Sequence, residues 1–480
     1  LPKTAWPPTS HKTGSPVSLR PCLRRALRSQ PHWEMHRKSH LEEPPPPVHP
    51  EVPYKLPSDL DMSITPKDFK RLDYIISKIS QATGLVITQK IWHGYQKCAY
   101  ILSPLKTLER FRMQLDFFTD FSVKNTPMLI SSKEIQSNTR QYGRFTIPNY
   151  NVEYVFLLMR RIFKNDFDEE HCNIIKMVLL QNPDEIEQYS EQYLGRKLGT
   201  EIAKYLLNSN IDNLQKQRDV YWQILRKFSS KQTSLSFSLK FKFNEMRRYL
   251  FRMKYPVGMS IALLSPDGGG KSSVYEKLLE SCWGSFHGIN RMYFRPRLLK
   301  NPGSLNPIHP TSEAEVNPDP HGKKANNMFK SFVRYFYYNL DFIFGYLLLV
   351  KKMQIQKQLV IFDRYYYDYF VDIKRYQYSF PKWIPRLFAC FIPKPDLVFI
   401  LDGSPETLYA RKQELPIKEL ERQVIAYRKI SKKYKNSILI NVERPLLDVV
   451  LDITEQILLH KAKRTSKSMN TNIDKNGIPF

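Results

Sequence analysis

The chain has 480 residues, enough for two or three domains that each bury a core. Its formal net charge of +28 would suit nucleic acid or an anionic membrane, but the cations are spread along the chain, which favours phosphorylated small molecules and no specific nucleic acid. The five cysteines are odd in number and show no CxxC spacing, so they support neither a disulfide framework nor a zinc site and favour a reducing, cytoplasmic setting.

The first 50 residues are rich in proline, arginine, serine and histidine, and they show no helical or strand period. This composition predicts a disordered or extended segment. No signal peptide is evident at the start. The most apolar run, residues 342–350, is far shorter than the roughly 20 residues that span a bilayer. We therefore expect one face of a buried helix there and no transmembrane segment, and peripheral membrane contact stays open.

Residues 51–150 predict a small α+β domain. Its expected strands are residues 60–64, 85–92, 98–102 and 111–118, with a helix over 66–83. Asp59 and Asp61 fall on one face of the first strand, because side chains alternate along a strand, and Asp116 lies in an otherwise apolar strand. Three carboxylates from adjacent strands could bind the Mg²⁺ ions of nucleotidyl transfer. The alternatives are a degenerate fold that acts as a scaffold or ligand sensor, and simple surface aspartates.

Residues 151–250 predict a helical extension that ends in a polar, serine-rich connection over 229–239. From 251 to 460 apolar strands alternate with helices, as a doubly wound parallel sheet requires. The expected strands are residues 259–264, 292–294, 359–362, 397–401 and 438–442. The basic, polar residues 461–480 are expected to fray as a tail.

The most informative stretch follows the strand at 259–264. A turn with three glycines leads into a helix that starts at Lys271, which is the layout of a phosphate-binding loop. Lys271 would reach the β- and γ-phosphates of a nucleotide, and Ser272 would hold Mg²⁺. Ser265 stands where the usual pattern has its first glycine. The expected binding residues are Asp267, Gly268, Gly269, Gly270, Lys271, Ser272 and Ser273.

Two further clusters fit a phosphate site. Asp363 and Arg364 follow the third strand, at the sheet edge where ligands of open α/β sheets bind, so Asp363 could hold Mg²⁺ and Arg364 could clamp a phosphate. Arg411 and Lys412 lie on a helix after the fourth strand, where cations could stabilise a phosphoryl transition state. An ordinary basic helix face is the alternative for this pair.

Residues 259–458 resemble the thymidylate kinase family of P-loop kinases. They look most like the thymidylate-kinase-like domains of bacterial surface-polysaccharide and lipopolysaccharide gene clusters. The matching motifs are residues 265–272 (SPDGGGKS), 294–296 (FRP), 317–318 (NP), 321–323 (HGK), 363–368 (DRYYYD) and 410–414 (ARKQE).

The resemblance implies an ATP- and Mg²⁺-dependent kinase. Lys271 and Ser272 would bind ATP phosphates and Mg²⁺, Asp267 would approach an acceptor sugar, and Arg411 would be a lid arginine. Asp363 and Arg364 would lie near the metal and the acceptor phosphate. The Arg-Glu-Pro-Gly segment of true thymidylate kinases is absent, and their thymine-reading helix is not recognisable. The acceptor therefore stays open between a nucleoside monophosphate such as thymidylate and a sugar of surface-glycan metabolism.

Residues 54–160 resemble the nucleotidyltransferase fold, through the Asp-x-Asp strand at 59–61 and the later Asp116. The Gly-Ser that precedes such a strand in that fold is missing. The chain is therefore expected to join a P-loop kinase to a divergent nucleotidyltransferase-like domain and to act on a small-molecule acceptor. A basic nucleic-acid-binding P-loop protein and a non-catalytic ATP-binding scaffold are the other hypotheses, and a homodimer is left open.

Overall fold

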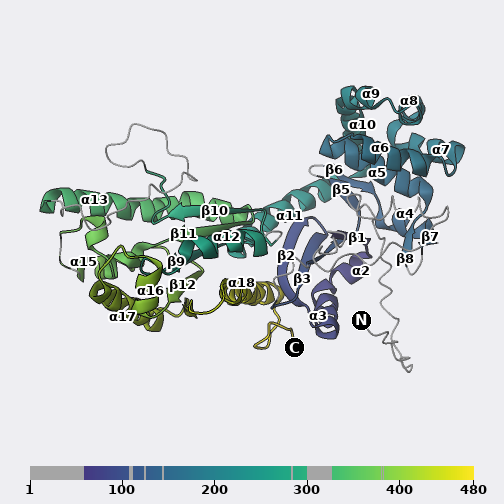
Figure 1. Ribbon diagram of the computed structural model, residues 1–480. Helices are drawn as coiled ribbons and strands as arrows, with labels where there is room; N and C mark the ends of the chain where they lie inside the picture. The colour runs from purple at the N-terminus through teal and green to yellow at the C-terminus, as the bar shows by residue number, and fades with distance from the viewer. Residues whose placement is uncertain are drawn as a thin grey trace.

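The computed structural model describes residues 59–106, 112–123, 126–142, 145–282, 285–299, 327–379, 381 and 383–480. The predicted disordered segment 1–50 and the motifs at 317–318 and 321–323 lie outside these ranges. Figure 1 shows three parts along an extended molecule: a unit built on a five-stranded sheet, a smaller four-stranded sheet, and a bundle of helices beyond it.

The four-stranded sheet has the order β1-β4-β3-β2. Its first strand runs parallel to β4 and the other pairs are antiparallel. The predicted helix between the first two strands is confirmed as two short pieces, α2 (Pro66–Phe69) and α3 (Leu72–Thr83). Thr65 caps the first of them by accepting a hydrogen bond from the amide of Asp68 (3.1 Å). The four strands are β1 (Asp59–Ser63), β2 (Val86–Gly94), β3 (Lys97–Ser103) and β4 (Met113–Phe118).

Two short hairpins follow that the sequence did not predict, because strands of three to five residues show too little alternation to be recognised. They are β5 (Phe121–Val123) with β6 (Thr126–Ile130), and β7 (Thr139–Tyr142) with β8 (Phe145–Pro148), separated by α4 (Ser132–Ser137). The predicted helical extension is confirmed as a bundle with its own apolar core. Its helices are α5 (Tyr150–Lys164), α6 (Glu169–Leu179), α7 (Pro183–Leu194), α8 (Arg196–Leu207), α9 (Ile211–Lys216) and α10 (Arg218–Gln232).

The polar connection predicted over 229–239 is wrong. The helix α10 runs to Gln232 and a long helix, α11 (Leu235–Lys254), begins three residues later. The hydroxyl of Ser234 caps α11 by accepting from the amide of Phe237 (3.2 Å). Phe237 then packs edge-on against Tyr95 of the β2–β3 turn, with ring centroids 5.6 Å apart. The serines that suggested a linker therefore include a helix cap.

The predicted doubly wound parallel sheet is confirmed. All five strands are parallel, in the order β10-β11-β9-β12-β13. The central strands are buried on both faces, which explains their nearly continuous apolar sequences. The strands are β9 (Met259–Leu264), β10 (Gly288–Tyr293), β11 (Gln358–Asp363), β12 (Leu397–Asp402) and β13 (Ser437–Asn441).

Helices cover both faces of this sheet. On one face α12 (Lys271–Ser281) and α18 (Leu446–Met469) pack against alternate strand residues such as Ile261 and Phe399. On the other face lie α13 (Met328–Leu340), the π-helix η1 (Asp341–Val350) and α17 (Ile417–Lys433). The remaining short helices are α14 (Lys351–Ile355), η2 (Tyr366–Phe370), η3 (Lys374–Tyr376), α15 (Trp383–Phe388) and α16 (Pro405–Arg411).

The prediction that residues 461–480 fray is wrong. The helix α18 continues to Met469, whose side chain enters the core of the four-stranded sheet, and Lys461 on the same helix is only 3% exposed. After the helix the chain folds back through a bridge between Ile473 and Pro479, and Gln81 donates to the carbonyl of Pro479 (2.9 Å). The prediction was based on the basic and polar composition of this segment, and it missed the apolar side chains that anchor the helix.

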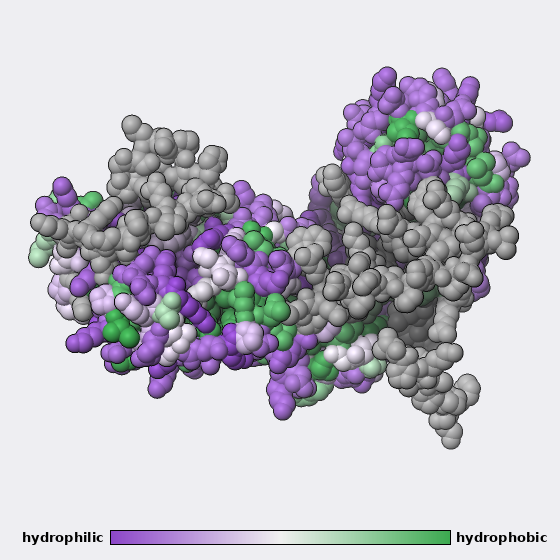
Figure 2. All heavy atoms as spheres, viewed as in Figure 1, coloured by the Kyte–Doolittle hydropathy of each residue, from purple (hydrophilic) through white to green (hydrophobic). Residues whose placement is uncertain are grey.

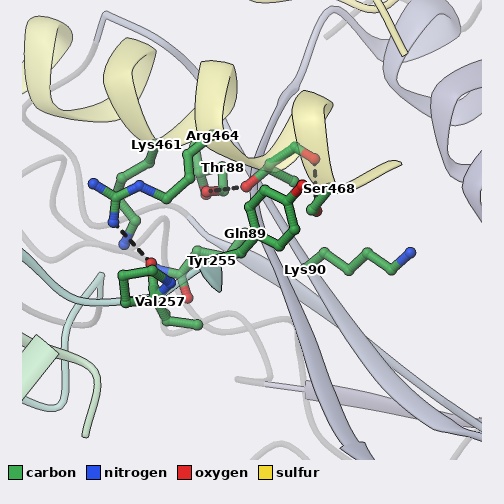
Figure 3. Close-up of a pocket in the computed structure, with 10 residues that line it drawn as sticks. Thr88, Gln89, Lys90, Tyr255, Val257, Lys461, Arg464 and Ser468 are labelled. Carbon is green, nitrogen blue, oxygen red and sulfur yellow. Dashed lines mark hydrogen bonds between the residues drawn. The ribbon is translucent and has the colours of Figure 1, made fainter. Parts of the chain in front are cut away.

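The helix α18 therefore joins the two sheets. Figure 3 shows this junction, where side chains of α18 reach strand β2 and the segment that precedes β9. Thr465 donates to the carbonyl of Thr88 (3.0 Å), and Arg464 donates to the carbonyls of Pro256 (2.8 Å) and Gly258 (2.9 Å). A small pocket lies between these groups. The contacts make the four-stranded sheet and the five-stranded unit one connected structure.

Candidate phosphate-binding site

The turn between β9 and α12 has the backbone of a phosphate-binding loop. Gly268 and Gly270 adopt φ values of +84° and +78°, which disfavour residues with side chains. Gly270 is also the N-cap of α12, so no side-chain cap occupies the amide groups of the first turn. Those amides and the positive end of the helix dipole form a site suited to an anion.

Ser265 shapes the loop from the position where a glycine is usual. Its hydroxyl is buried and donates to the carbonyl of Pro266 (2.7 Å). A Cβ atom added at Gly269 would lie 1.6 Å from that hydroxyl oxygen, so residue 269 must be glycine while residue 265 is serine. Gly269, the second glycine of the run, thus leaves room for the serine that stands in place of the usual first glycine.

This compensation can be tested by substitution. We expect Gly269→Ala to disrupt the loop and to reduce nucleotide affinity at least tenfold, about 1.4 kcal/mol, because the new methyl group overlaps Ser265. The double variant Ser265→Gly/Gly269→Ala removes the overlapping atoms and is expected to recover most of the affinity. Isothermal titration with Mg-ATP measures both. Equal loss in the single and double variants would show that the overlap is not the cause.

Lys271 lies where the predicted phosphate ligand should be. Its Nζ donates to the carbonyls of Ser265 (3.1 Å) and Pro266 (3.3 Å), so the ammonium group points back over the loop. Burial, together with the nearby positive charge of Arg364, lowers the pKa of Lys271 to about 8. An anion bound in the loop would favour the charged form and raise this pKa again.

Asp363 ends strand β11 next to the loop, as predicted. One carboxylate oxygen, Oδ2, is paired with Arg291. The other oxygen, Oδ1, is buried and has no hydrogen-bond partner among the described residues. A buried carboxylate oxygen in this state is suited to a cation such as Mg²⁺, either directly or through water. Ser272 is exposed in the first turn of α12, with its hydroxyl available to a ligand at the same end of the sheet.

A buried cluster of ion pairs connects the loop to the segment that follows strand β11. Arg364 is 3% exposed and donates to Asp267 of the loop (2.7 Å) and to Asp368 (2.9 Å). A second guanidinium, that of Arg375, pairs with the other oxygen of Asp267 and with Asp372 (3.0 Å). Both terminal nitrogens of Arg364 donate to carboxylates, so this side chain links the loop to the segment after β11. Phosphate binding by Arg364 stays a prediction.

The carboxylate of Asp267 is ionised in this cluster. Burial alone would raise its pKa, but the positive charges of Arg364, Lys271 and Arg375 more than offset this and lower the pKa to about 2. Arg375 was not singled out in the sequence, because it lies in a short turn with no motif of its own. The one sequence feature that could have pointed to Arg375 is its position shortly after Asp363 and Arg364.

Arg411 lies near the loop without joining the cluster. Its helix α16 packs on the loop so closely that a Cβ atom at Gly268 would be 2.3 Å from the carbonyl of Leu408. The Arg411 guanidinium itself donates to the carbonyl of Val442 (2.9 Å). The neighbouring Lys412, the C-cap of α16, pairs with Glu414 (2.9 Å), and its charge is the smallest of the contributions that lower the pKa of Asp267.

The predicted carboxylates of the four-stranded sheet are partly brought together. Asp61 and Asp116 are directly opposite each other in the β1–β4 register. Asp61 is paired with Arg160 (3.1 Å), and both oxygens of Asp116 accept from Gln114 (3.1 and 3.2 Å). Within the part of the chain that the structure describes, no three His, Cys, Asp or Glu side chains are grouped to hold a metal ion. Metal binding by Asp59, Asp61 and Asp116 stays a prediction.

The loop, Lys271 and Asp363 together define a candidate nucleotide-phosphate site on a parallel α/β sheet. No protein-family model and no curated protein matches this chain. Among solved structures it is similar to thymidylate kinase from Ehrlichia chaffeensis, with 18% identity and a TM-score of 0.28, over 42% of this chain and 97% of that chain.

Proposed function

We propose that the chain is an ATP- and Mg²⁺-dependent phosphotransferase that phosphorylates a small molecule, with a nucleoside monophosphate such as thymidylate as the first candidate acceptor. The observation that carries the proposal is a combination of three features at one sheet edge. They are a helix N-terminus without a side-chain cap, a lysine folded over the loop, and a buried carboxylate oxygen with no hydrogen-bond partner among the described residues. Each of these groups matches a different part of Mg-ATP.

The residues have separate roles in this proposal. The amides of the α12 first turn and Lys271 bind the β- and γ-phosphates and hold the transferring group in line with the acceptor. Asp363 and the hydroxyl of Ser272 hold Mg²⁺, which supplies charge neutralisation when bound. Asp267 stays ionised and, with Arg364 and Arg375, fixes the loop.

A sugar or glycan precursor is the second candidate acceptor. The segment after β10 favours it, because Arg295 does not project as a free phosphate-binding group. Its guanidinium is buried, pairs with Asp341 and donates to the carbonyl of Leu299 (2.9 Å). The segment after β10 is therefore held to the start of η1 by a buried ion pair.

The test is ADP release by the full chain with Mg-ATP across a panel of acceptors. The panel contains thymidylate, the other nucleoside monophosphates and bacterial glycan sugars, and Asp363→Asn is the control variant. Stimulation by one acceptor class, lost in Asp363→Asn, is the expected result. Stimulation by sugars alone would replace the nucleotide proposal by the glycan one. ATP binding without turnover on any member would overturn both.

A further inference from the structure

The helix α13 and the short helix α15 lie at the end of the molecule farthest from the four-stranded sheet (Figure 1). Large apolar side chains are exposed there, and hydrophobic residues are visible at that end in Figure 2. The buried stripe of α13 and η1 includes Tyr335, Phe342 and Tyr346, while the opposite side faces solvent. Phe329 is 75% exposed and Leu348 is 59% exposed. The short helix α15 adds further residues of the same kind. We call this surface the outer apolar face, and its main residues are Phe329, Phe332, Leu340, Leu348, Trp383 and Leu387.

The helices α13 and α15 form one continuous surface, because contacts between aromatic rings connect them. Phe332 contacts Phe336 on α13, with ring centroids 4.6 Å apart. Phe336 contacts Phe388 of α15 (5.4 Å), and Phe388 contacts Phe391 (6.2 Å), which is 64% exposed. The exposed residues of α15 therefore continue the outer apolar face beyond α13. An apolar surface of this extent on a folded protein marks an interaction site.

In the described segments that carry the outer apolar face, residues 327–379 and 383–395, the exposed charged residues are cations. They include Lys330, Lys351, Lys352, Arg386 and Lys394. All acidic residues of the described segments 327–379 and 383–395 are buried in the interior, at 7% exposure or less, and they are Asp341, Asp363, Asp368 and Asp372. This segment thus presents apolar and positive groups to solvent without an exposed carboxylate of its own.

We infer that the outer apolar face binds an anionic phospholipid surface, with its aromatic and aliphatic side chains inserted among the lipids and its lysines at the headgroups. A helix with an apolar face and flanking cations has the composition of interfacial membrane helices. Pairing with a second copy of this chain about a twofold axis would bring the same cations together without carboxylates to balance them. No described helix is long and apolar enough to cross a membrane, so the contact is peripheral.

This inference is independent of the proposed reaction, since it concerns a surface and not the phosphate site. It is tested with the full chain and two kinds of vesicle: pure phosphatidylcholine, and phosphatidylcholine mixed with an equal part of phosphatidylglycerol. We expect the chain to cosediment with the mixed vesicles, to bind pure phosphatidylcholine much less, and to dissociate as salt is raised. The variant Phe329→Gln/Leu348→Gln/Trp383→Gln should bind the mixed vesicles roughly tenfold more weakly.

The long helix α11 offers a matched control, because it also exposes apolar residues. Leu239→Gln/Leu250→Gln changes side chains that are 68% and 60% exposed there and should leave vesicle binding unchanged. Thermal unfolding of both variants checks that they fold. Equal binding by wild type and the triple variant would overturn the inference. A dimer in sedimentation velocity that the triple variant dissociates, without vesicle binding, would instead assign the face to a second copy.

Discussion

Replacement of Lys271 by alanine is expected to lower the rate of phosphoryl transfer by about 10²–10³-fold, because the variant loses a preorganised positive charge at the transferring phosphate. The folded structure should tolerate the change. The Lys271 ammonium is held by two backbone carbonyls and its pKa is lowered by burial, so its removal costs little stability. Initial rates of ADP release under saturating Mg-ATP measure the effect.

The control for this experiment lies on the same helix. Lys277 of α12 is paired with Glu280 (2.6 Å) at the surface, away from the loop, and Lys277→Ala should keep full activity. Circular dichroism of both variants verifies the fold. If Lys271→Ala retains activity within a factor of two or so of wild type, the loop does not carry the chemistry. If it loses turnover while the fold is kept, ATP binding is not merely structural.

The second large effect is expected at Asp368, the buried partner of Arg364. Its Oδ2 accepts from Arg364 (2.9 Å) and Tyr376 (3.2 Å), and its Oδ1 accepts from Tyr427 (2.9 Å). Asp368→Asn removes the charge and leaves the guanidinium under-compensated in a site without exposure to water. We expect the free energy of local unfolding of strands β9 and β11 to fall by about 3–5 kcal/mol.

Hydrogen exchange of the β9 and β11 amides measures this loss locally, which is needed because a chain of several units does not unfold in one step. The matched variant is Asp402→Asn, which breaks the pair with Arg428 (2.9 Å) near the surface and should cost at most about 1 kcal/mol. A similar small effect at both positions would mean that the Arg364 cluster does not hold the loop.

Much of the five-stranded unit could be predicted from sequence, for a physical reason. Strands buried on both faces, such as β9 and β11, are continuous apolar runs that stand out from the amphipathic helices between them. The loop was predictable because glycines and a lysine have few other reasons to occur together between a strand and a helix. The connection over 229–239 was misjudged because a serine cap and a serine-rich linker look alike in a sequence.

The candidate site was only partly predictable. Lys271 and Asp363 lie in motifs, so their positions could be anticipated. Arg375 and Arg291 carry no local pattern and reach the site through the fold, the first from a turn after β11 and the second from β10. The contacts of Arg364 could not be predicted either, because one of its two carboxylate partners, Asp267, lies far away along the chain.

The long helix α18 limits how the sequence of this protein can vary. One end of the helix covers the five-stranded sheet and the other completes the core of the four-stranded sheet. A gene recombination that exchanged either half for another would leave an apolar hole or an uncovered helix. Substitutions along α18 must therefore satisfy two interiors at once.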